Sequence, residues 1–515
     1  MKKFKGLWLI FCAALLAGCI QPAQNTRPWL LNTPQAEPEP TQQATSVLPL
    51  PTSIPTLAIT LPIRDPNLPY SSPTPDPIRP QPTLRSEVET YTVQAGDSLA
   101  IIAARYNLPV SILINANTLI NPDYLEVGQS ITIPALVPSV DPSAFKILPD
   151  SELLYGPYSA ILDVTRFIHK EGGYLSTYSE EVDGISTSGA DILIRIAYEY
   201  SVNPRLLLAF LEYQSGWVTR MNPDTTTLDY PIGLQDPYRK GLYRQLAWAA
   251  NQVNRGYYLW KSNEISYLVM TDGNLVLMPP EINAGTAGIQ AAFATLLDAA
   301  SWKNAVSVEG FYATFIHFFG IPFDYSIEPV IPENLEQPPF ILPFEQGVSW
   351  SFTGGPHASW GNGSVWGALD FSPPGDSYGC FISDAWVTAV ADGIIARASN
   401  GEVILDLDGD GLEQTGWVVL YMHIESRGRV AVGTKVMAGD RIGHPSCEGG
   451  VSTGTHFHIA RRYNGEWIPA DGDMPFNFEG WIAQSDGSEY NGTLTRDGAS
   501  VTAWEGRIAQ NQISR

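Results

Sequence analysis

The chain reads Val451-Ser452-Thr453-Gly454-Thr455-His456-Phe457-His458-Ile459 near its carboxyl-terminal end, and this segment carries its clearest structural signal. A turn rich in Gly and Thr leads into alternating polar and apolar residues, which is the pattern of a β-strand. Residues i and i+2 of a strand point to the same face, so we expect His456 and His458 to present their imidazoles side by side. Because imidazole is the commonest metal-binding side chain near neutral pH, the segment predicts a metal site.

Other ligands for such a site stand upstream, since five of the seven histidines fall between residues 357 and 458. Asp370 lies in an apolar segment, where a carboxylate is costly unless it is paired or bound to a metal. His357 follows a Gly-Gly-Pro loop that can turn its side chain inward, and His423 interrupts an apolar run that reads as a buried strand. A catalytic zinc needs three nitrogen or oxygen ligands and one open position, and these residues are candidates for it. Histidines with purely structural partners are the alternative.

The segment over roughly residues 345–480 resembles the lysostaphin-type zinc metallopeptidases, and within them the beta-lytic (staphylolysin) branch. The spacing from His357 to Asp370 is similar to that branch, whereas the better-known branch has its histidine where Trp366 stands. The runs Cys447-Glu448-Gly449-Gly450 and Tyr463-Asn464-Gly465, on either side of the two histidines, resemble the same branch. The sequence contains no HExxH motif, which excludes a thermolysin-like zinc site.

The resemblance implies a role for each of five polar residues. His357, Asp370 and His458 would bind one zinc ion per peptidase domain. His423 and His456 would be catalytic and face the reacting carbonyl, where they stabilise the oxyanion and pass a proton to the leaving amine. A catalytically inactive relative that keeps the fold is the alternative.

The amino-terminal end has the pattern of an export signal. Three lysines precede an apolar run over residues 7–16, which is too short to span a bilayer. The run ends in Leu16-Ala17-Gly18-Cys19, which resembles a bacterial lipobox and implies removal of residues 1–18 and a lipid anchor on Cys19. An ordinary secretory signal, in which Cys19 has no special role, is the alternative. Residues 19–89 are rich in Pro and Thr and predict an extended linker from the membrane towards the cell wall.

Cysteine usage and charge narrow the compartment and the partners. Cys12 falls in the signal peptide and Cys19 is the lipidation candidate, which leaves Cys380 and Cys447. A leftover pair in an exported protein suggests a disulfide, with two free thiols as the alternative. The formal net charge of −23 opposes binding of nucleic acid. We therefore expect a membrane-anchored lipoprotein of the bacterial cell envelope that faces the wall.

Residues 90–135 resemble a LysM module, through the runs Tyr91-Thr92-Val93, Gly96-Asp97-Ser98-Leu99 and Val127-Gly128-Gln129. Asp97 or Ser98 can cap a first helix, and the apolar residues that follow give this helix one buried face. The resemblance implies a groove for the N-acetylglucosamine glycan of peptidoglycan, which would include Gly96, Asp97, Ser98, Leu99 and Asn117. A βααβ domain that has lost its ligand is the alternative.

Residues 145–335 are mostly helical by pattern. The run from Asn203-Pro204 to Ser215-Gly216 resembles the start of lytic transglycosylases, in which an acid stands immediately before Ser-Gly. Gln214 occupies that place, and an amide cannot protonate a glycosidic oxygen. Glu212, two residues earlier, points to another face of a helix. We therefore expect a non-catalytic lysozyme-like domain, with a glycan-cleaving transglycosylase as the alternative.

Two further expectations concern the carboxyl-terminal half. Asp406-Leu407-Asp408-Gly409-Asp410-Gly411 imitates a calcium loop, but Trp417 stands where an EF-hand has its Glu, so a hairpin turn is favoured. Residues 481–515 predict a few strands packed on the peptidase, with fraying after Arg507.

Together these patterns predict a multidomain α+β protein with a small βααβ module, a mostly helical middle domain and a mostly antiparallel β peptidase domain over residues 340–480. For this last domain the resemblance implies the lysostaphin-like fold, a duplicated hybrid motif with a groove. The implied function is a lipid-anchored zinc metallo-endopeptidase that cuts cross-link peptides of peptidoglycan and holds the glycan through LysM. The alternative from another class is a wall-binding scaffold or hydrolase activator, which has no need of bound metal.

Overall fold

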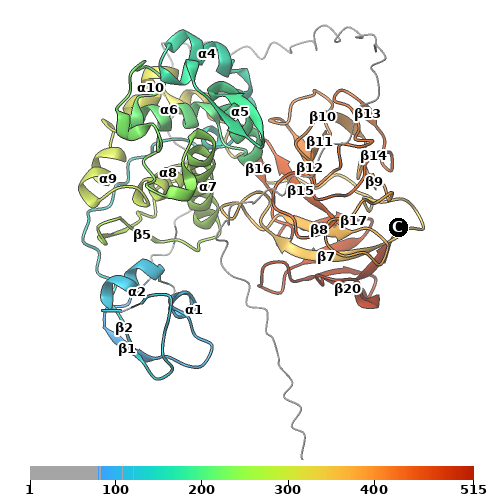
Figure 1. Cartoon of the computed structure of the whole chain (residues 1–515), viewed down its shortest axis with the longest axis horizontal. Coiled ribbons are helices and arrows are strands. Elements are labelled where there is room, and N and C mark those ends of the chain that lie inside the picture. The colour runs from blue at the N-terminus through green and yellow to red at the C-terminus, as the bar shows by residue number, and fades with distance from the viewer. Residues whose placement is uncertain (1–78, 80–82, 107, 120) are drawn as a thin grey trace, which may run out of the picture. The chain divides into compact units, whose positions relative to one another are not determined.

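Figure 1 shows the computed structural model, which describes residues 79, 83–106, 108–119 and 121–515. The expected signal peptide, Cys19 and most of the expected linker lie outside the described residues. Within the described ranges no single helix is long and apolar enough to cross a membrane, although the bent pair at residues 99–105 and 110–116 together has the length and hydropathy of a span.

The first described unit is a βααβ module. Its outer strands, β1 (Glu89–Thr92) and β2 (Ser130–Ile133), pair antiparallel, and α1 (Leu99–Arg105) and α2 (Val110–Ala116) lie between them in sequence. The Ser98 hydroxyl accepts a hydrogen bond from the Ile101 amide and so caps α1. The apolar core of the module includes Leu99, Ile102, Leu113, Ile131 and Ile133, and Leu275 from the following helical part of the chain belongs to the same core.

The middle of the chain is helical. Its helices are α3 (Asp150–Leu153), α4 (Val164–Glu171), α5 (Gly189–Tyr200), α6 (Pro204–Ser215), α7 (Leu242–Lys261), α8 (Ala284–Ala294), α9 (Ala299–Ala305) and α10 (Phe311–Phe319). Two short hairpins interrupt them, β3 (Ser179–Val182) with β4 (Ile185–Ser188) and β5 (Tyr267–Val269) with β6 (Leu275–Leu277). In the core, Phe210 of α6 stacks on Phe293 of α8 with 4.6 Å between ring centroids. We call this unit the helical domain.

A nine-stranded antiparallel sheet forms the centre of the carboxyl-terminal part. In sheet order its strands are β13 (Lys435–Val436), β10 (Gly393–Ser399), β11 (Glu402–Asp406), β12 (Trp417–Met422), β15 (Phe457–Tyr463), β8 (Ala368–Ser372), β7 (Ser349–His357) and β21 (Gln512–Ser514), with β16 (Glu466–Trp467) paired to β15. The short strands β9 (Val387–Thr388) and β14 (Arg441–Gly443) pair separately. The predicted α+β class is confirmed by the helical domain and this sheet.

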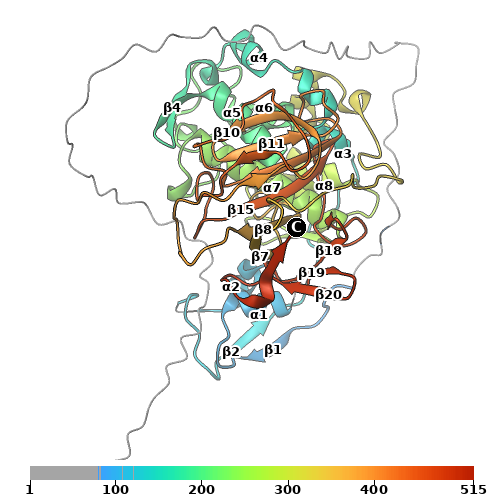
Figure 2. The ribbon, with the colours of Figure 1, turned by 90° about the vertical axis from the view of Figure 1, so that its right-hand side faces the viewer.

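Both faces of the central sheet are covered, as strand β12 shows. Val419 and Tyr421 belong to the apolar core of the carboxyl-terminal part, which we call the sheet domain. Val418 and Leu420 belong instead to the same apolar core as the helices. The second face continues at Ile404 in β11, Ala460 in β15 and Ala368 in β8. A strand that is buried on both faces has no polar side to show, which explains the continuous apolar run of β12. Figure 2 looks onto this region, where β10 and β11 run side by side.

The carboxyl-terminal segment adds a second sheet, made of β17 (Asn477–Phe478), β18 (Trp481–Gln484), β19 (Thr493–Arg496) and β20 (Ala499–Thr502). Its first pairing, β17 with β18, joins residues on both sides of the expected boundary at residue 480. The expected fraying after Arg507 is wrong, because β21 pairs with β7 in the central sheet. The buried side chain of Asn511 fixes this return by donating to the carbonyls of Phe352, Trp504 and Gly506.

Candidate metal centre

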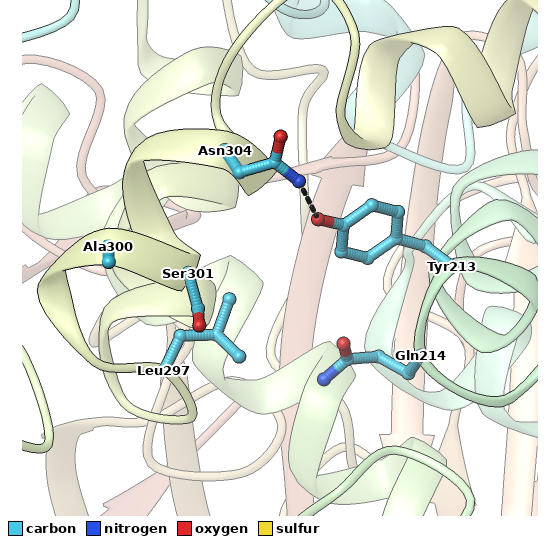
Figure 3. Close-up of a pocket in the computed structure, with 6 residues that line it drawn as sticks. All are labelled: Tyr213, Gln214, Leu297, Ala300, Ser301 and Asn304. Carbon is cyan, nitrogen blue, oxygen red and sulfur yellow. Dashed lines mark hydrogen bonds between the residues drawn. The ribbon is translucent and has the colours of Figure 1, made fainter.

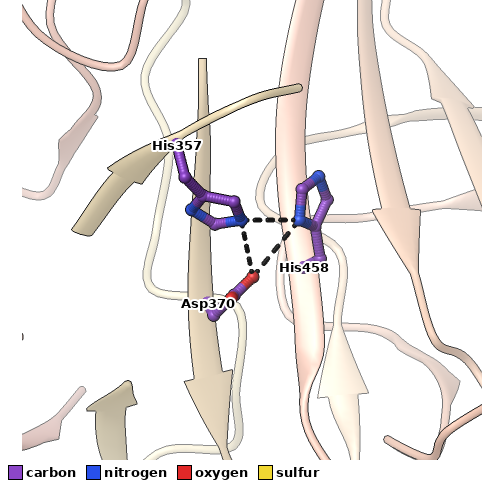
Figure 4. A group of neighbouring side chains, drawn as sticks. All are labelled: His357, Asp370 and His458. Atoms are coloured by element: carbon purple, nitrogen blue, oxygen red, sulfur yellow. Dashed lines mark hydrogen bonds and ion pairs between the residues drawn. The ribbon is translucent and has the colours of Figure 1, made fainter. Parts of the chain in front are cut away.

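Three polar side chains meet at one end of the central sheet. His357 is the last residue of β7, Asp370 lies within β8, and His458 is the second residue of β15. The pairing of β8 with β15 sets Asp370 directly opposite His458. The β7–β8 pairing is irregular between Gly354 and His357, and such a bulge re-aims the side chains that follow it. The three side chains therefore point at one another (Figure 4).

Ligand atoms of these residues lie within contact distance. Oδ1 of Asp370 is 3.2 Å from Nε2 of His357 and 3.2 Å from Nδ1 of His458. The two nitrogens are 3.0 Å apart. His357 and Asp370 are buried, and His458 is nearly so, with a side-chain exposure of 13%. One cation could contact all three atoms at once.

In each of the two histidine rings, one nitrogen faces Asp370 and the other faces away from it. The hydrogen bond of the nitrogen that faces away determines which nitrogen carries the lone pair. Nδ1 of His357 lies 2.8 Å from the Gly355 carbonyl oxygen, and Nε2 of His458 lies 3.0 Å from the Ser359 carbonyl oxygen. A carbonyl oxygen only accepts, so these outer nitrogens carry the protons in the neutral rings. Oδ1 of Asp370 is buried and accepts no hydrogen bond from the described residues. With both rings neutral in these tautomers, the lone pairs of His357 Nε2 and His458 Nδ1 converge with Asp370 Oδ1, and this arrangement fits a metal ion.

The charge state of the cluster suits a cation. Burial opposes ionisation of Asp370, yet the imidazoles of His357 and His456 hold the pKa of its carboxyl well below the usual range. Burial lowers the pKa of His458. The carboxyl is therefore an anion and His458 a neutral ligand, which are the forms that bind a metal.

The other two predicted site residues border the cluster. His423 follows β12 and His456 precedes β15, and their ring centroids are 4.5 Å apart. Nδ1 of each donates to a carbonyl, His423 to Glu448 at 3.0 Å and His456 to Gly454 at 2.7 Å. Nε2 of His456 is 3.8 Å from Oδ2 of Asp370. The structure thus brings together all five residues proposed for the site.

His423 has an unusual backbone and a depressed basicity. Its φ of 63° lies in the left-handed region, which costs a non-glycine residue roughly 1–2 kcal/mol and is typical of functional sites. Burial, followed by repulsion from His456 and His458, lowers the pKa of His423 to about 3. The ring is therefore neutral, and because Nδ1 donates to the Glu448 carbonyl, its Nε2 carries the lone pair.

Tyr490 is a neighbour of the site that sequence reasoning did not single out. It lies between β18 and β19, and its ring stacks on His357 with 4.2 Å between centroids and 19° between planes. Two backbone hydrogen bonds hold the contact, Gly355 amide to Tyr490 carbonyl at 2.7 Å and Tyr490 amide to Pro356 carbonyl at 3.1 Å. Burial, followed by the charge of Asp370, raises the pKa of Tyr490 to about 12. The only signal in the sequence is a Tyr-Asn-Gly turn, which does not reveal its partner.

Cys380 and Cys447 form a disulfide with 5.9 Å between their Cα atoms. It joins the loop before β9 to the Glu448-Gly449-Gly450 turn, which supplies the carbonyl partner of His423. The same two loops meet again where the Thr455 amide donates to the Gly379 carbonyl and the Phe381 amide donates to the Thr455 hydroxyl. The disulfide therefore lies in the immediate surroundings of the five-residue site.

The predicted glycan-binding residues of the βααβ module have contacts within the module. Asp97 accepts hydrogen bonds from the Tyr91 hydroxyl and the Gln94 amide, and Leu99 is buried. Asn117 bridges α2 to β2 through the Leu113 carbonyl and both backbone groups of Thr132. Gly96 has a φ of 92° in the tight turn before the cap Ser98. Glycan contact by these residues stays a prediction.

Gln214 lines a cavity of about 520 Å³ in the helical domain (Figure 3). Its Nε2 donates to the Ile232 carbonyl at 2.7 Å. Glu212 is not among the residues that line this cavity. Its carboxylate accepts hydrogen bonds from the Val218 and Thr219 amides and from the Thr219 hydroxyl. The structure therefore places no carboxylate on the wall of this cavity among the described residues.

Asp406, Asp408 and Asp410 come together after β11. Their oxygens accept backbone amides of the same turn, such as Gly411 on Asp406 at 2.7 Å and Leu412 on Asp410 at 2.7 Å. Burial, followed by the neighbouring Asp406, raises the pKa of Asp408 to about 7. The segment connects β11 to β12, in agreement with the favoured turn.

Comparison with known families divides the chain into three parts. Residues 91–134 match the LysM domain, residues 146–331 match the LasA N-terminal domain, and residues 379–469 match peptidase family M23. The helical domain, expected to be lysozyme-like, thus has its match in the LasA N-terminal domain. The M23 match covers His423, His456 and His458 but begins after His357 and Asp370, which the strand pairing adds to the site.

Individual relatives agree with these matches. Protease LasA of Pseudomonas aeruginosa is 26% identical over 359 residues, which is 64% of this chain and 77% of the relative. The beta-lytic metalloendopeptidase of Achromobacter lyticus is 29% identical over 177 residues, covering 32% of this chain and 42% of the relative. Among solved structures, the M23 metalloprotease pseudoalterin from the deep sea covers 35% of this chain and 99% of its own, with 24% identity and a TM-score of 0.29. The chain is a metalloendopeptidase in which a domain that matches peptidase family M23 is joined to a LysM domain and a LasA-like amino-terminal domain.

Proposed function

We propose that the chain is a zinc-dependent peptidoglycan hydrolase that cleaves cross-link peptides of the bacterial cell wall. The observation that carries the proposal is the convergence of His357 Nε2, His458 Nδ1 and Asp370 Oδ1, each within 3.2 Å of the others. Two nitrogens and one oxygen are the donor set of a catalytic zinc, which leaves one position open for water or substrate.

In this proposal His357 holds zinc through Nε2, His458 through Nδ1 and Asp370 through Oδ1. When bound, the metal supplies Lewis-acid polarisation of the scissile carbonyl and a nucleophilic water near neutral pH. The protein orients the ligands from outside, because the Gly355 and Ser359 carbonyls fix the rotation of both rings.

His423 and His456 handle the protons of the reaction. In both rings Nδ1 is held by a carbonyl, so Nε2 is the atom that exchanges a proton. One imidazole would take a proton from the attacking water on its Nε2 and pass it to the leaving amine, and the other, when protonated on both nitrogens, would donate its Nε2 proton to the developing oxyanion. Their position beside the ligand cluster puts both within reach of one reacting peptide bond.

The LysM match supports peptidoglycan as the substrate, with its N-acetylglucosamine glycan held by residues 90–135. The M23 match and the LasA and beta-lytic relatives support cleavage of peptides. We further propose that a lipid on Cys19 anchors the protein to a membrane and that residues 19–89 span the distance to the wall. A protein with this organisation acts in the cell envelope.

The test is release of new amino groups from purified peptidoglycan, measured together with binding to the same material. We expect His458→Ala and a zinc chelator each to abolish amine release while wall binding remains. His317→Ala is the matched control, because this histidine is exposed on α10 and outside the site. Wall binding without amine release by the unmodified protein would instead support the scaffold alternative. Release of anhydro-sugars would support the transglycosylase.

A further inference from the structure

The loop between β7 and β8 carries the outer partner of a proposed zinc ligand. Nε2 of His458 donates to the Ser359 carbonyl at 3.0 Å, and this bond sets which nitrogen of the ring faces Asp370. Because Ser359 is two residues beyond His357, the same loop also leaves directly from a second proposed ligand. The position of this loop therefore bears on two of the three ligands.

The loop is closed by its own hydrogen bonds. The Ser359 amide donates to the Val365 carbonyl at 3.0 Å, and the Trp360 amide donates to the Ser364 hydroxyl at 2.9 Å. The Ser364 hydroxyl in turn donates to the Gly361 carbonyl at 3.0 Å. A group that fixes the tip of such a closed loop also fixes the Ser359 carbonyl at its base.

The side chain that fixes the tip of this loop, at Asn362 and Gly363, belongs to the helical domain. Oδ1 of Asn251, on α7, accepts the Gly363 amide at 2.8 Å, and its Nδ2 donates to Oδ1 of Asn362 at 2.7 Å. Beside this contact, Trp360 meets Tyr200 of α5 edge to face, with 6.4 Å between centroids. Both polar ends of the Asn251 side chain are thus used on the loop.

Two glycines allow this contact. A Cβ on Gly363 would lie 2.0 Å from the backbone oxygen of Asn251, and a Cβ on Gly361 would lie 2.7 Å from the Asn251 Oδ1. Gly361 also has a φ of 61°, which a side chain would strain. The sequence Gly361-Asn362-Gly363 is therefore shaped to receive α7.

We infer that Asn251 is a positioning residue for the metal centre and that the helical domain is in this way part of it. Asn251 acts through Gly363 and the closed loop on Ser359, and through Ser359 on His458. The inference rests on the proposed function, because it takes His458 as a zinc ligand. It predicts that a change in the helical domain weakens zinc binding in the peptidase domain.

The test is the zinc affinity of the full chain, measured by competition with a chromophoric chelator. Asn251→Leu removes both hydrogen bonds at similar size and is expected to weaken zinc binding about tenfold, the lower end for loss of an outer-shell partner. Asn251→Asp keeps the acceptor for the Gly363 amide and is expected to retain most of the affinity. Gln252→Ala is the control, since this neighbour on α7 makes no hydrogen bond that the described structure shows.

A second variant approaches the contact from the other side. Gly363→Ala sets a methyl group against the Asn251 backbone and is expected to weaken zinc binding in the same way, with α7 itself unchanged. Excess zinc should restore peptide cleavage in both variants, which a mere loss of fold would not allow. Zinc affinities of Asn251→Leu and Gly363→Ala equal to that of the unmodified protein would overturn the inference. An unmodified protein that binds no zinc would instead refute the proposed function itself.

Discussion

At the scale of single residues, two neighbours hold the imidazole ring of His357 in place. The Gly355 carbonyl holds its Nδ1, and the ring of Tyr490 covers its face at 4.2 Å. Tyr490 has a left-handed backbone conformation, with a φ of 67°, at this position beside His357. Strain of this kind persists only where surrounding contacts impose it, and here two backbone hydrogen bonds do so.

We expect Tyr490→Ala to weaken zinc binding and Tyr490→Phe to leave it unchanged. An aromatic stack is worth about 0.5–1.5 kcal/mol, so its loss frees the His357 ring and lowers zinc affinity by roughly two- to tenfold. The phenylalanine keeps the stack and loses only the hydroxyl. Isothermal titration with zinc measures both variants. Equal affinities for Ala and Phe at this position would show that the stack does not orient His357.

The sequence could identify the five residues of the site but not Tyr490. His456 and His458 share a strand, and the strand period alone places them side by side. Asp370 is a candidate because of its apolar surroundings and His357 because of the Gly-Gly-Pro loop before it, and the family resemblance implies their role as ligands. Tyr490 reaches His357 because β18 and β19 fold back over the end of β7, and a tertiary return of this kind leaves no local pattern.

At the scale of elements, a covalent bond joins two of the loops that surround the site. The disulfide between Cys380 and Cys447 joins the loop before β9 to the turn that holds His423. The residues it links are 67 apart in sequence, so it closes a long loop of the unfolded chain.

We expect the double variant Cys380→Ala, Cys447→Ala to lose about 2–4 kcal/mol of unfolding free energy, as is typical for removal of a native disulfide. Urea unfolding followed by tryptophan fluorescence measures the change. The variant should also lose peptidase activity at temperatures where it remains folded, because the Glu448 carbonyl no longer has a fixed place beside His423. Unchanged activity in the folded variant would show that the turn holds its shape without the disulfide.

Strand β12 shows what an apolar pattern can and cannot predict. Its continuous apolar run predicts a buried strand, and β12 is buried at every position. The pattern does not name the partner on each face, since Val419 packs within the sheet domain and Val418 packs with the helices. The end of the chain shows the reverse case, because residues 512–514 look polar yet complete the sheet along β7.

At the scale of the whole molecule, a buried ion network lies where the sheet meets the helical domain. Glu413 is buried between Arg397 and Arg462, which donate to it at 2.7 Å each. Arg462 also donates to the Tyr198 carbonyl of α5 at 3.4 Å. Burial opposes ionisation of Glu413, but Arg397 and then Arg462 bring its pKa below the ordinary value of 4.5.

This depressed pKa predicts a pH-dependent effect of Glu413→Gln. A carboxylate whose folded pKa lies below 4.5 stabilises the fold above that pH, and this contribution is lost as pH falls through the folded pKa. The variant leaves the buried Arg462 without its anion, whereas Arg397 keeps its ion pair with Glu402, so it should cost about 3–5 kcal/mol at pH 7. The difference from the unmodified protein, measured by denaturant unfolding, should shrink as the pH is lowered below 4.5. A difference that is constant between pH 7 and the acid limit would contradict the ion network.

The central claim is that His357, Asp370 and His458 bind one zinc ion. The most direct test is the zinc content per chain after dialysis against metal-free buffer, for the unmodified protein, for Asp370→Ala and for the control His317→Ala. We predict one zinc per chain in the unmodified protein and the control, and none in Asp370→Ala. One zinc retained by Asp370→Ala, or none in the unmodified protein, would contradict the account.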